Sequence, residues 1–330
     1  MSLDLTLACG EMDLTNPLES GEVEPEGVDL TVLNYASPER HWRMIRHTEF
    51  DICEMSLGSY LSSRSQSSDF PFTAIPAFPH RRFRHSYMFT PADSGITSPG
   101  ELNGSSIGLR TWQTTAGIWM RGIAEEHYGL DLEDVEWYTD DTEDVPLSIP
   151  DKYDITSIPD GHDVESMLVN DELDGAFYPA LIRSVKSPDG NARRIFEDSL
   201  EAEQGYFEET GIFPLMHTVV IRDKVLEENP WVAINVFRAF QRARDVCLEK
   251  LEDPRWTALA WARQHLEHQQ SVMGRNPWPF GLTEENKHAL DTLLGYASDQ
   301  GLIPYEYDYD EIFVESTLDE EIWDKEYVSQ

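Results

Sequence analysis

Short apolar runs alternate with helix-forming segments along this chain, and this alternation constrains the fold more than any other feature. Four such runs in the first 80 residues have the length and composition of β-strands; they span residues 3–8, 29–33, 50–54 and 72–78. Ser37 and Pro38 indicate a helix start after the second run, because serine favours the N-cap and proline the first helical position. Strands that alternate with helices predict an α/β unit.

A second series of the same kind follows an extended run at 86–90, which we expect to lead into a first crossing between two units. The series contains predicted strands and helices of ordinary length; the strands span 106–109, 135–138 and 175–178, and the helices 114–128 and 164–170. The apolar run at 213–221 is the expected return crossing, because a long helix opens after it at Asn229 and Pro230 and the remainder is mainly helical.

Two α/β units joined by two crossings predict a two-lobed α/β fold with a central cleft. Lobe 1 is expected to be discontinuous, with residues 1–90 and 220–330, and lobe 2 to comprise residues 91–219. The 330 residues are 40% hydrophobic, which provides enough apolar material for two ordinary cores. Loops at the strand ends converge on such a cleft, so a hinged ligand-binding site is expected there.

The chain is strongly acidic, with 62 Asp and Glu residues against 25 Lys and Arg residues and a formal net charge of −37. Phosphate groups and anionic lipids bind basic surfaces, so neither nucleic acid nor a membrane is an expected partner. The carboxylates are spread along the whole chain, and at molar salt the Debye length of about 3 Å suppresses their mutual repulsion. This pattern indicates a haloadapted surface.

Other features exclude several classes of site. Cys9, Cys53 and Cys247 are widely spaced, lack a metal-binding spacing and are expected to be buried free thiols. Motifs of nucleotide-binding loops, zinc proteases and serine hydrolases are absent, and no metal site is predicted. The first ten residues lack the basic and apolar regions of a signal peptide, and no run is long enough to span a bilayer, so a cytoplasmic location is expected.

The densest group of cationic residues lies at 79–86, just before the expected first crossing, and includes Arg82, Arg84 and His85. Guanidinium groups bind carboxylates through paired hydrogen bonds, and an imidazole can exchange a proton near neutral pH. In extended backbone Arg82 and Arg84 share one face and His85 takes the other, so not all of them can face the cleft. The alternative is that these arginines pair with the abundant surface carboxylates.

A second candidate is residues 108–117, where a predicted strand passes into a predicted helix. Free backbone N–H groups at a helix N-terminus favour an anion, and Arg110 would add a positive charge. Trp112, Thr114 and Thr115 lie in the same segment, and we include them among the expected substrate-binding residues. One of the two threonines is also expected to cap the helix.

Three further residues are candidates for the cleft. His217 is a single histidine in an apolar strand at the return crossing; such a histidine is often part of the core, but at the edge of a cleft it can serve as an acid or base. Glu54 lies where a strand end turns into a helix start, and Trp278 lies in a loop rich in aromatic residues and proline. Packing is the alternative role for both.

Six segments, in the same order along nearly the whole chain, resemble the 4,5-dihydroxyphthalate decarboxylase family. They span residues 83–86, 102–112, 116–119, 210–217, 229–231 and 278–281. This family is similar in fold to type II periplasmic binding proteins, so the resemblance implies a two-lobed, periplasmic-binding-protein-like type II fold. The acidic surface would make this chain a haloarchaeal-type member.

The resemblance implies decarboxylation of a small, anionic, dihydroxylated aromatic dicarboxylate to a monocarboxylate, without an organic cofactor. Loss of CO2 from such a ring needs an acid, a base and groups that hold the carboxylates. We expect Arg110 and either Arg82 or Arg84 to bind the carboxylates. His85 and His217 are expected to transfer protons, and Glu54 to contact a ring hydroxyl.

Two alternatives share the expected fold. A solute-binding protein of the ABC-transporter type would hold a small aromatic or carboxylate ligand without chemistry, although the absence of a recognisable signal peptide counts against it. A relative that carries out different chemistry on another aromatic acid is the second, because one fold hosts many functions. The sequence leaves open whether the chain forms a homo-oligomer.

Overall fold

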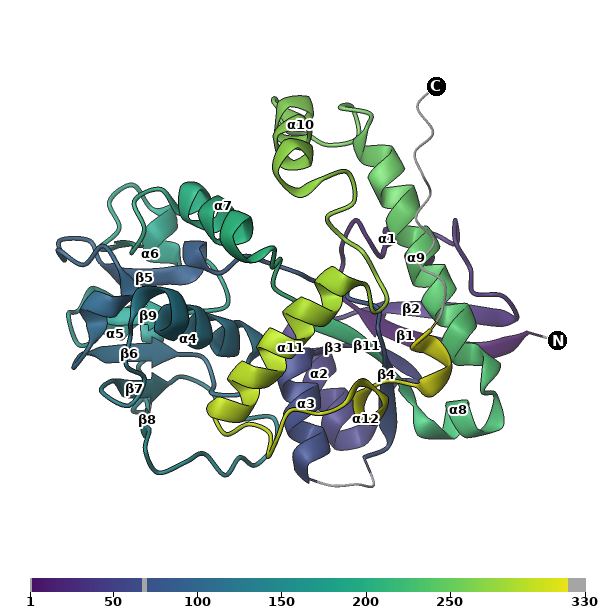
Figure 1. The fold of residues 1–330 in the computed structure, drawn as a ribbon, viewed down its shortest axis with the longest axis horizontal. Helices are drawn as coiled ribbons and strands as arrows, with labels where there is room; N and C mark the ends of the chain where they lie inside the picture. The colour runs from purple at the N-terminus through teal and green to yellow at the C-terminus, as the bar shows by residue number, and fades with distance from the viewer. Residues whose placement is uncertain (1, 67–69, 320–330) are drawn as a thin grey trace.

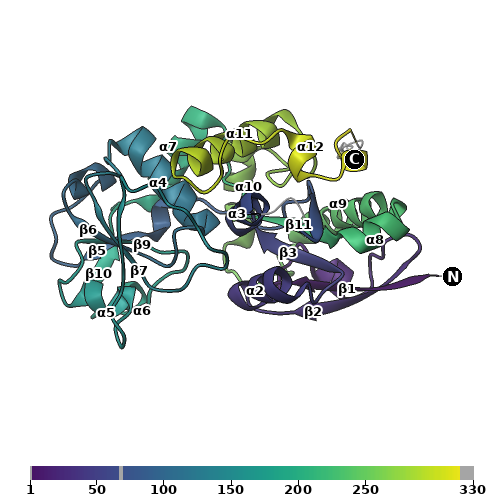
Figure 2. The same ribbon diagram turned by 90° about the horizontal axis from the view of Figure 1, so that it is seen from below.

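The computed structural model describes residues 2–66 and 70–319 and contains two lobes, each built around one β-sheet (Figure 1). The first lobe has a five-stranded sheet of order β2-β1-β3-β11-β4, and the second has a six-stranded sheet of order β10-β5-β9-β6-β7-β8. The two sheets lie at opposite ends of the long axis in both views (Figure 2).

The first sheet combines strands from distant parts of the chain: β1 Leu3–Cys9, β2 Val28–Asn34, β3 Ile52–Ser56, β4 Phe72–Ile75 and β11 His217–Arg222. β1 is parallel to β2 and β3, whereas β11 is antiparallel to both of its neighbours, β3 and β4. The four early strands lie within a few residues of their predicted positions. The run expected to be the return crossing instead ends in β11, an interior strand of this sheet.

The second sheet is formed by one continuous part of the chain: β5 Met88–Pro91, β6 Ser106–Leu109, β7 Glu136–Thr139, β8 Asp154–Ser157, β9 Gly175–Phe177 and β10 Ala192–Arg194. β6 is parallel to β7 and β9, and β5 is antiparallel to β9 and β10. The lobe boundaries expected after residues 90 and 219 fall inside β5 and β11. β8 and β10 are short and were not predicted.

Helices cover the faces of both sheets and form most of the C-terminal part. Those of the first lobe and the C-terminal region are α1 Asn16–Glu19, α2 Ser37–His47, α3 Leu57–Gln66, α8 Asp223–Glu228, α9 Trp231–Leu251, α10 Ala262–Met273, α11 Glu284–Asp299 and α12 Tyr309–Ile312. Those of the second lobe are α4 Thr115–Tyr128, α5 Val164–Val169, α6 Arg183–Lys186 and α7 Ser199–Thr210. Three 3₁₀ turns complete the elements, at His85–Tyr87, Pro99–Leu102 and Glu315–Thr317.

α11 runs across the junction of the lobes and ties the second lobe to the C-terminal region (Figure 1). Gln300, at the end of α11, accepts a hydrogen bond from Nε1 of Trp112 at 3.0 Å on its backbone oxygen. Its side-chain oxygen accepts one from Nε of Arg121 at 2.9 Å. These buried contacts fix α4 relative to the end of α11, and the start of α4 borders the cleft.

The core encloses β3 and confirms the expectation for the cysteines. All five residues of β3 are buried, as in a strand covered on both faces. Cys9, Cys53 and Cys247 are free and buried. Within residues 2–66 and 70–319, none of the helices combines the length and the apolar composition required to cross a bilayer.

Candidate active site

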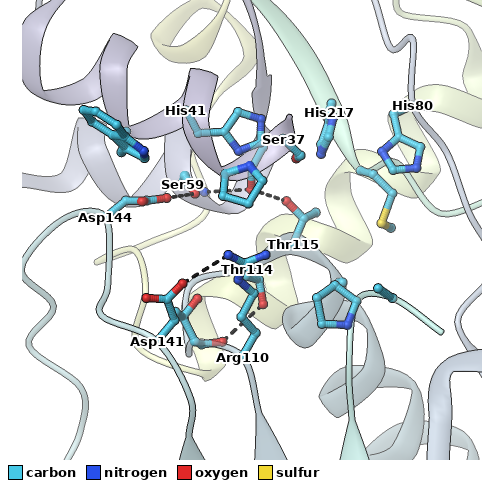
Figure 3. A pocket seen from close by; sticks show the side chains of 18 of the residues that line it. Ser37, His41, Ser59, His80, Arg110, Thr114, Thr115, Asp141, Asp144 and His217 are labelled. Carbon is cyan, nitrogen blue, oxygen red and sulfur yellow. Dashed lines mark hydrogen bonds and ion pairs between the residues drawn. The ribbon is translucent and has the colours of Figure 1, made fainter. Parts of the chain in front are cut away.

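A cavity of about 680 Å³ lies between the two lobes (Figure 3). The first lobe contributes residues of α2, of the β3–α3 junction and of the start of β11, and the second contributes the β6–α4 junction and the loop after β7. The volume is within the range of small-molecule sites, roughly 300–1,000 Å³. The cavity is therefore the expected cleft, and its polar residues define the candidate site.

Two strands place Glu54 and His217 on one face of the first sheet. Val219 lies opposite Glu54 in the β3–β11 ladder, and His217 lies opposite Ser56. Alternate residues of a strand share a face, and diagonal neighbours on adjacent strands are within reach of long side chains. Accordingly, Nδ1 of His217 is 2.5 Å from Oε1 of Glu54. The carboxylate accepts the Nδ1–H and leaves Nε2 available for proton exchange.

Arg40 holds the Glu54 carboxylate in place from α2. Its Nη2 lies 2.8 Å from Oε1 of Glu54 in an ion pair whose side chains are 3% and 0% exposed. Its Nη1 donates to the backbone oxygen of Tyr35, and the backbone N–H of Gly10 donates to Oε2 of Glu54 at 2.7 Å. Both carboxylate oxygens are therefore occupied by protein groups, so Glu54 is suited to orient His217 rather than to contact a ligand.

Two more imidazoles approach His217. The ring centroid of His41 lies 5.1 Å from that of His217, and the ring centroid of His80 lies 4.5 Å from it, both edge to face. Burial lowers the pKa of His80 to about 2. Burial also lowers the pKa values of His41 and His217 well below the ordinary histidine value, with Arg40 and Arg84 adding to the effect on His217. All three imidazoles are thus neutral at neutral pH.

Arg84 is a buried cation at the cavity without a carboxylate partner among the described residues. Its side chain contacts the Met216 sulfur, and Nη1 donates to the backbone oxygen of Pro179 at 3.2 Å. Burial lowers its pKa to about 9, with the charge of Arg82 adding to this effect. A buried guanidinium normally has a counterion, so this one favours an anion in the cavity.

Arg110 and the start of α4 form the second-lobe wall of the cavity. Arg110 pairs with Asp141 at 3.1 Å, and both residues are partly exposed. Thr115 spans the two lobes, because its hydroxyl lies 2.8 Å from Oγ of Ser56 and accepts from the backbone N–H of Gly58 at 2.9 Å. Thr114 occupies the N-cap position, but its hydroxyl donates to Thr111 and does not cap the helix, so the expected side-chain cap is wrong.

A second cavity of about 410 Å³ lies behind the imidazoles and shares His80, His217 and Ser37 with the first. Arg40 and Glu54 also line it. His217 and His80 therefore stand between two cavities, with the Glu54 carboxylate on the side of the smaller one.

Glu54, His80 and His217 each offer a ligand atom within 4.8 Å of the others, a set that suits a divalent cation in principle. Arg40 argues against this use, because its Nη2 lies 2.8 Å from Oε1 of Glu54 and 3.4 Å from Nδ1 of His217. A fixed positive charge at these distances repels a dication. The three residues fit a hydrogen-bonded acid–base group better than a metal site.

The structure brings most of the sequence-predicted residues to the cavities. Those that line the larger cavity are His217, Arg84, Arg110, Thr114 and Thr115, whereas Arg82 and Glu54 line the smaller one. In addition, Arg82 donates to the Tyr87 hydroxyl at 3.1 Å.

Three predicted residues lie outside the lining of both cavities. Trp112 is fully buried, with the guanidinium of Arg121 3.8 Å from its ring centroid. Trp278 packs edge to face on Phe213. His85 is fully buried among aromatic rings, and neither of its ring nitrogens has a hydrogen-bond partner in the described part of the chain.

Sequence reasoning missed Arg40, His41, His80 and Asp144. A signal for His80 was present, since the alternation that puts Arg82 and Arg84 on one face puts His80 there too. Arg40 and His41 are consecutive on α2 and are both buried, which no local pattern indicates. Asp144 lies in a loop among many acidic residues and is distinguished only by its hydrogen bond to Ser59 at 3.2 Å.

Comparison with known proteins gives two relatives by sequence. The chain is 32% identical to the 4,5-dihydroxyphthalate decarboxylase of Comamonas testosteroni over 325 residues, 96% of this chain and 98% of that protein. It is 36% identical to the enzyme of the same name from Pseudomonas putida over 183 residues, 54% of this chain and 70% of that protein. A search against protein-family models gave no match.

Among solved structures, the periplasmic aliphatic sulphonate binding protein from Escherichia coli superimposes with a TM-score of 0.55 at 12% identity, over 96% of this chain and 99% of that one. The likeness confirms the expected two-lobed, periplasmic-binding-protein-like fold. At this identity it carries no information on the ligand.

Proposed function

Because this chain belongs to the 4,5-dihydroxyphthalate decarboxylase family, we propose that it releases CO2 from 4,5-dihydroxyphthalate or a closely similar dihydroxylated aromatic dicarboxylate. It is a carboxy-lyase, and the reaction replaces one carboxylate by a proton. The observation that carries the proposal is the buried pair of Glu54 and His217 beside Arg84, which has no carboxylate partner among the described residues.

Two arginines are suited to hold the ortho carboxylates of the substrate. The Arg84 guanidinium is buried and forms no ion pair with a carboxylate of the described residues, so a substrate carboxylate would compensate its charge. Arg110 shares its charge with Asp141 and is partly exposed, so it would serve the second carboxylate more weakly. The hydroxyls of Thr114 and Thr115 line the same wall and can donate to carboxylate oxygens.

His217 is suited to deliver the proton to the ring carbon that carries the departing carboxylate. Its Nδ1 is held by Glu54, so Nε2 can carry the transferable proton. Burial, with the surrounding arginines, lowers the pKa of this imidazole and keeps it neutral, whereas a bound dianion would raise that pKa by opposing the arginine charges. The substrate would thus promote protonation of its own acid.

A binding role without chemistry is the competing function. Solute-binding proteins share the fold, and their ligands also occupy the cleft between lobes. Holding a ligand does not require a carboxylate directed at an imidazole, and Glu54 lines the smaller cavity rather than the larger one. The arrangement of these two residues therefore favours catalysis.

The test is CO2 release from 4,5-dihydroxyphthalate by the full chain in molar KCl, with product followed by chromatography. His217→Gln should lower kcat by roughly 10²–10⁴-fold, the usual contribution of a positioned acid or base. Glu54→Gln should also lower kcat, up to ~10⁴-fold, because an amide can hold the wrong imidazole tautomer. His162→Gln, an exposed loop substitution outside both cavities, is the matched control.

Binding of the substrate without turnover by the wild-type chain would favour the solute-binding function. Turnover that survives in His217→Gln at the level of the control would remove His217 from proton transfer while leaving the carboxy-lyase activity intact.

We also propose that the enzyme works at high salt inside the cell. The net charge of −37 supports this, because screening is needed to bring so many carboxylates close together.

A further inference from the structure

Decarboxylation of a dihydroxylated ring requires a group that accepts the proton of a ring hydroxyl, and the expected candidate for this role does not fit it. Glu54 was predicted to contact a hydroxyl, but its side chain is fully buried. Oε1 contacts His217 and Arg40, and Oε2 accepts from the backbone N–H of Gly10. The hydroxyl must therefore be served by another residue.

Two carboxylates line the larger cavity within the described ranges, those of Asp141 and Asp144. Asp141 is paired with Arg110 at 3.1 Å and its side chain is 55% exposed. Asp144 forms no ion pair with a described residue, and its Oδ2 accepts a hydrogen bond from the Ser59 hydroxyl at 3.2 Å. Asp144 is thus the carboxylate of this wall that retains oxygens free to accept from a ligand.

The position of Asp144 relative to the imidazoles matches the shape of the substrate. Figure 3 shows Asp144 and Ser59 at one side of the cavity, with His217 and His80 at the other. In 4,5-dihydroxyphthalate the hydroxyls are at the end of the ring opposite the carboxylates. A ring whose departing carboxylate faces Arg84 and His217 therefore directs the hydroxyl para to that carboxylate toward Asp144.

We propose that Asp144, oriented by Ser59, accepts the proton of the ring hydroxyl para to the departing carboxylate. The inference deepens the proposed function and rests on it. Ser59 belongs to α3 of the first lobe and Asp144 to the loop after β7 of the second. The base is therefore in place only when the two lobes meet across the cleft.

The step balances without an oxidant or reductant. Asp144 takes the hydroxyl proton, the oxygen becomes a carbonyl, and the ring electrons form a C–H bond with the proton from His217. The C–C bond then breaks, and its electron pair stays in the ring as CO2 leaves. The oxygen recovers the proton from Asp144, and solvent returns one proton to His217.

The charges around Asp144 suit this role. Burial raises the pKa of Asp144, which makes it a stronger base than an exposed aspartate, and Asp141 adds to the rise. The Ser59 hydrogen bond and the charges of Arg46 and Arg110 act in the opposite direction. The carboxylate form is the active one, so turnover should fall as the pH drops through the raised pKa.

The test compares Asp144→Asn with the wild type and with Asp160→Asn, an exposed loop substitution that removes the same charge away from the cavity. Asp144→Asn should lower kcat by roughly 10²–10⁴-fold near neutral pH. Its activity should recover at high pH as the substrate phenol, with a pKa of about 10 or below, ionises in solution. Calorimetric binding of phthalate, which lacks hydroxyls, should be the same in all three proteins.

The possible results are distinguishable. Asp144→Asn with the turnover of Asp160→Asn overturns the inference while the decarboxylase activity stands. Turnover of Asp144→Asn that is lost and does not recover at high pH assigns Asp144 a structural role, and so does lost phthalate binding. Either result also overturns the inference. A wild-type chain that binds phthalate but releases no CO2 contradicts the proposed function itself, and the inference falls with it.

Discussion

His85 lies in surroundings unlike those of the three cavity histidines. The rings of Tyr128, Phe196 and Tyr206 are packed around it, with centroids 5.2 to 5.8 Å away. Burial lowers its pKa to about 4, with His127 contributing. A buried imidazole without a hydrogen-bond partner costs stability, because its nitrogens lose their contacts with water.

Replacement of His85 by phenylalanine should reduce the acid sensitivity of the fold. At pH values between the lowered pKa of about 4 and the ordinary value of 6.5, His85 binds a proton in the unfolded chain but not in the folded chain. The free energy of unfolding therefore falls as the pH drops below 6.5. The free energy of unfolding, measured with urea, should fall between about pH 7.5 and about pH 5. The fall should be ~2 kcal/mol larger for the wild type than for His85→Phe. Equal losses would contradict the lowered pKa.

The same variant decides whether His85 transfers protons. Its position outside the lining of both cavities leads us to expect turnover near that of the wild type. A folded His85→Phe protein without turnover would instead support the role predicted from the sequence.

At the residue scale, apolar strands allowed candidate site residues to be predicted, whereas the sequences of the helices indicated few of them. Glu54 and His217 could be selected because each is an ionisable residue in an apolar strand. Their contact with one another could not be predicted, since it depends on a ladder that joins residues 163 positions apart. Arg40 becomes part of the site only because α2 packs against β3.

Among the secondary-structure elements, α3 begins where the first lobe packs directly against the second. A Cβ atom added to Gly58 would lie 2.2 Å from the backbone oxygen of Gln113 and 2.8 Å from the side chain of Ile118. Both of these residues belong to the second lobe, so a side chain at position 58 must push the starts of α3 and α4 apart. Ser59 and Thr115, which border the cavity, would move with them.

Gly58→Ala should therefore lower the free energy of unfolding by about 1–3 kcal/mol, the usual cost of overpacking, and should lower kcat/KM. Gly205→Ala in α7 is the matched control, since an added Cβ there meets no atom within 4 Å. In a helix interior that change should stabilise by about 0.5–1 kcal/mol. A neutral Gly58→Ala would mean that the lobes can separate at this point without cost.

Most strands of the first lobe could be predicted because they are long, apolar and separated by clear turns. β8 and β10 carry mainly polar residues, unlike β6 and β9 of the same lengths, so no apolar run indicated them. β11 was recognised as extended but was assigned to a crossing, because its pairing partners lie far away in the sequence. Helix ends were accurate to about one residue, with Ala36 rather than Ser37 at the N-cap of α2.

The whole molecule carries its acidic charge on both lobes, and this leads to a prediction on salt. Urea unfolding in KCl rising from ~0.1 M to ~2 M should show an increasing free energy of unfolding, because the Debye length falls from about 10 Å to a few Å. Sucrose at matched osmolality is the control, since it stabilises by exclusion without screening charge. A free energy of unfolding that does not change with KCl concentration, or that rises equally in sucrose, would argue against haloadaptation.

The two-lobed architecture could be predicted because the strand–helix alternation occurs twice with an interruption. The chemistry of the cleft could be predicted only in outline, since it depends on α2, α3 and two crossings meeting in space. The reaction was predicted from the resemblance to a known family. The contact between Glu54 and His217 became visible only with the pairing of β3 and β11.

The order of strands in the first sheet has a consequence for synthesis of the chain. β4 is paired with β11, and β11 separates it from β3. When β4 emerges from the ribosome, the strand that will hold it has not been made, whereas residues 88–194 provide every strand of the second sheet in one stretch. The lobe that begins later can therefore be completed first, and β4 must wait for a segment made well over a hundred residues afterwards.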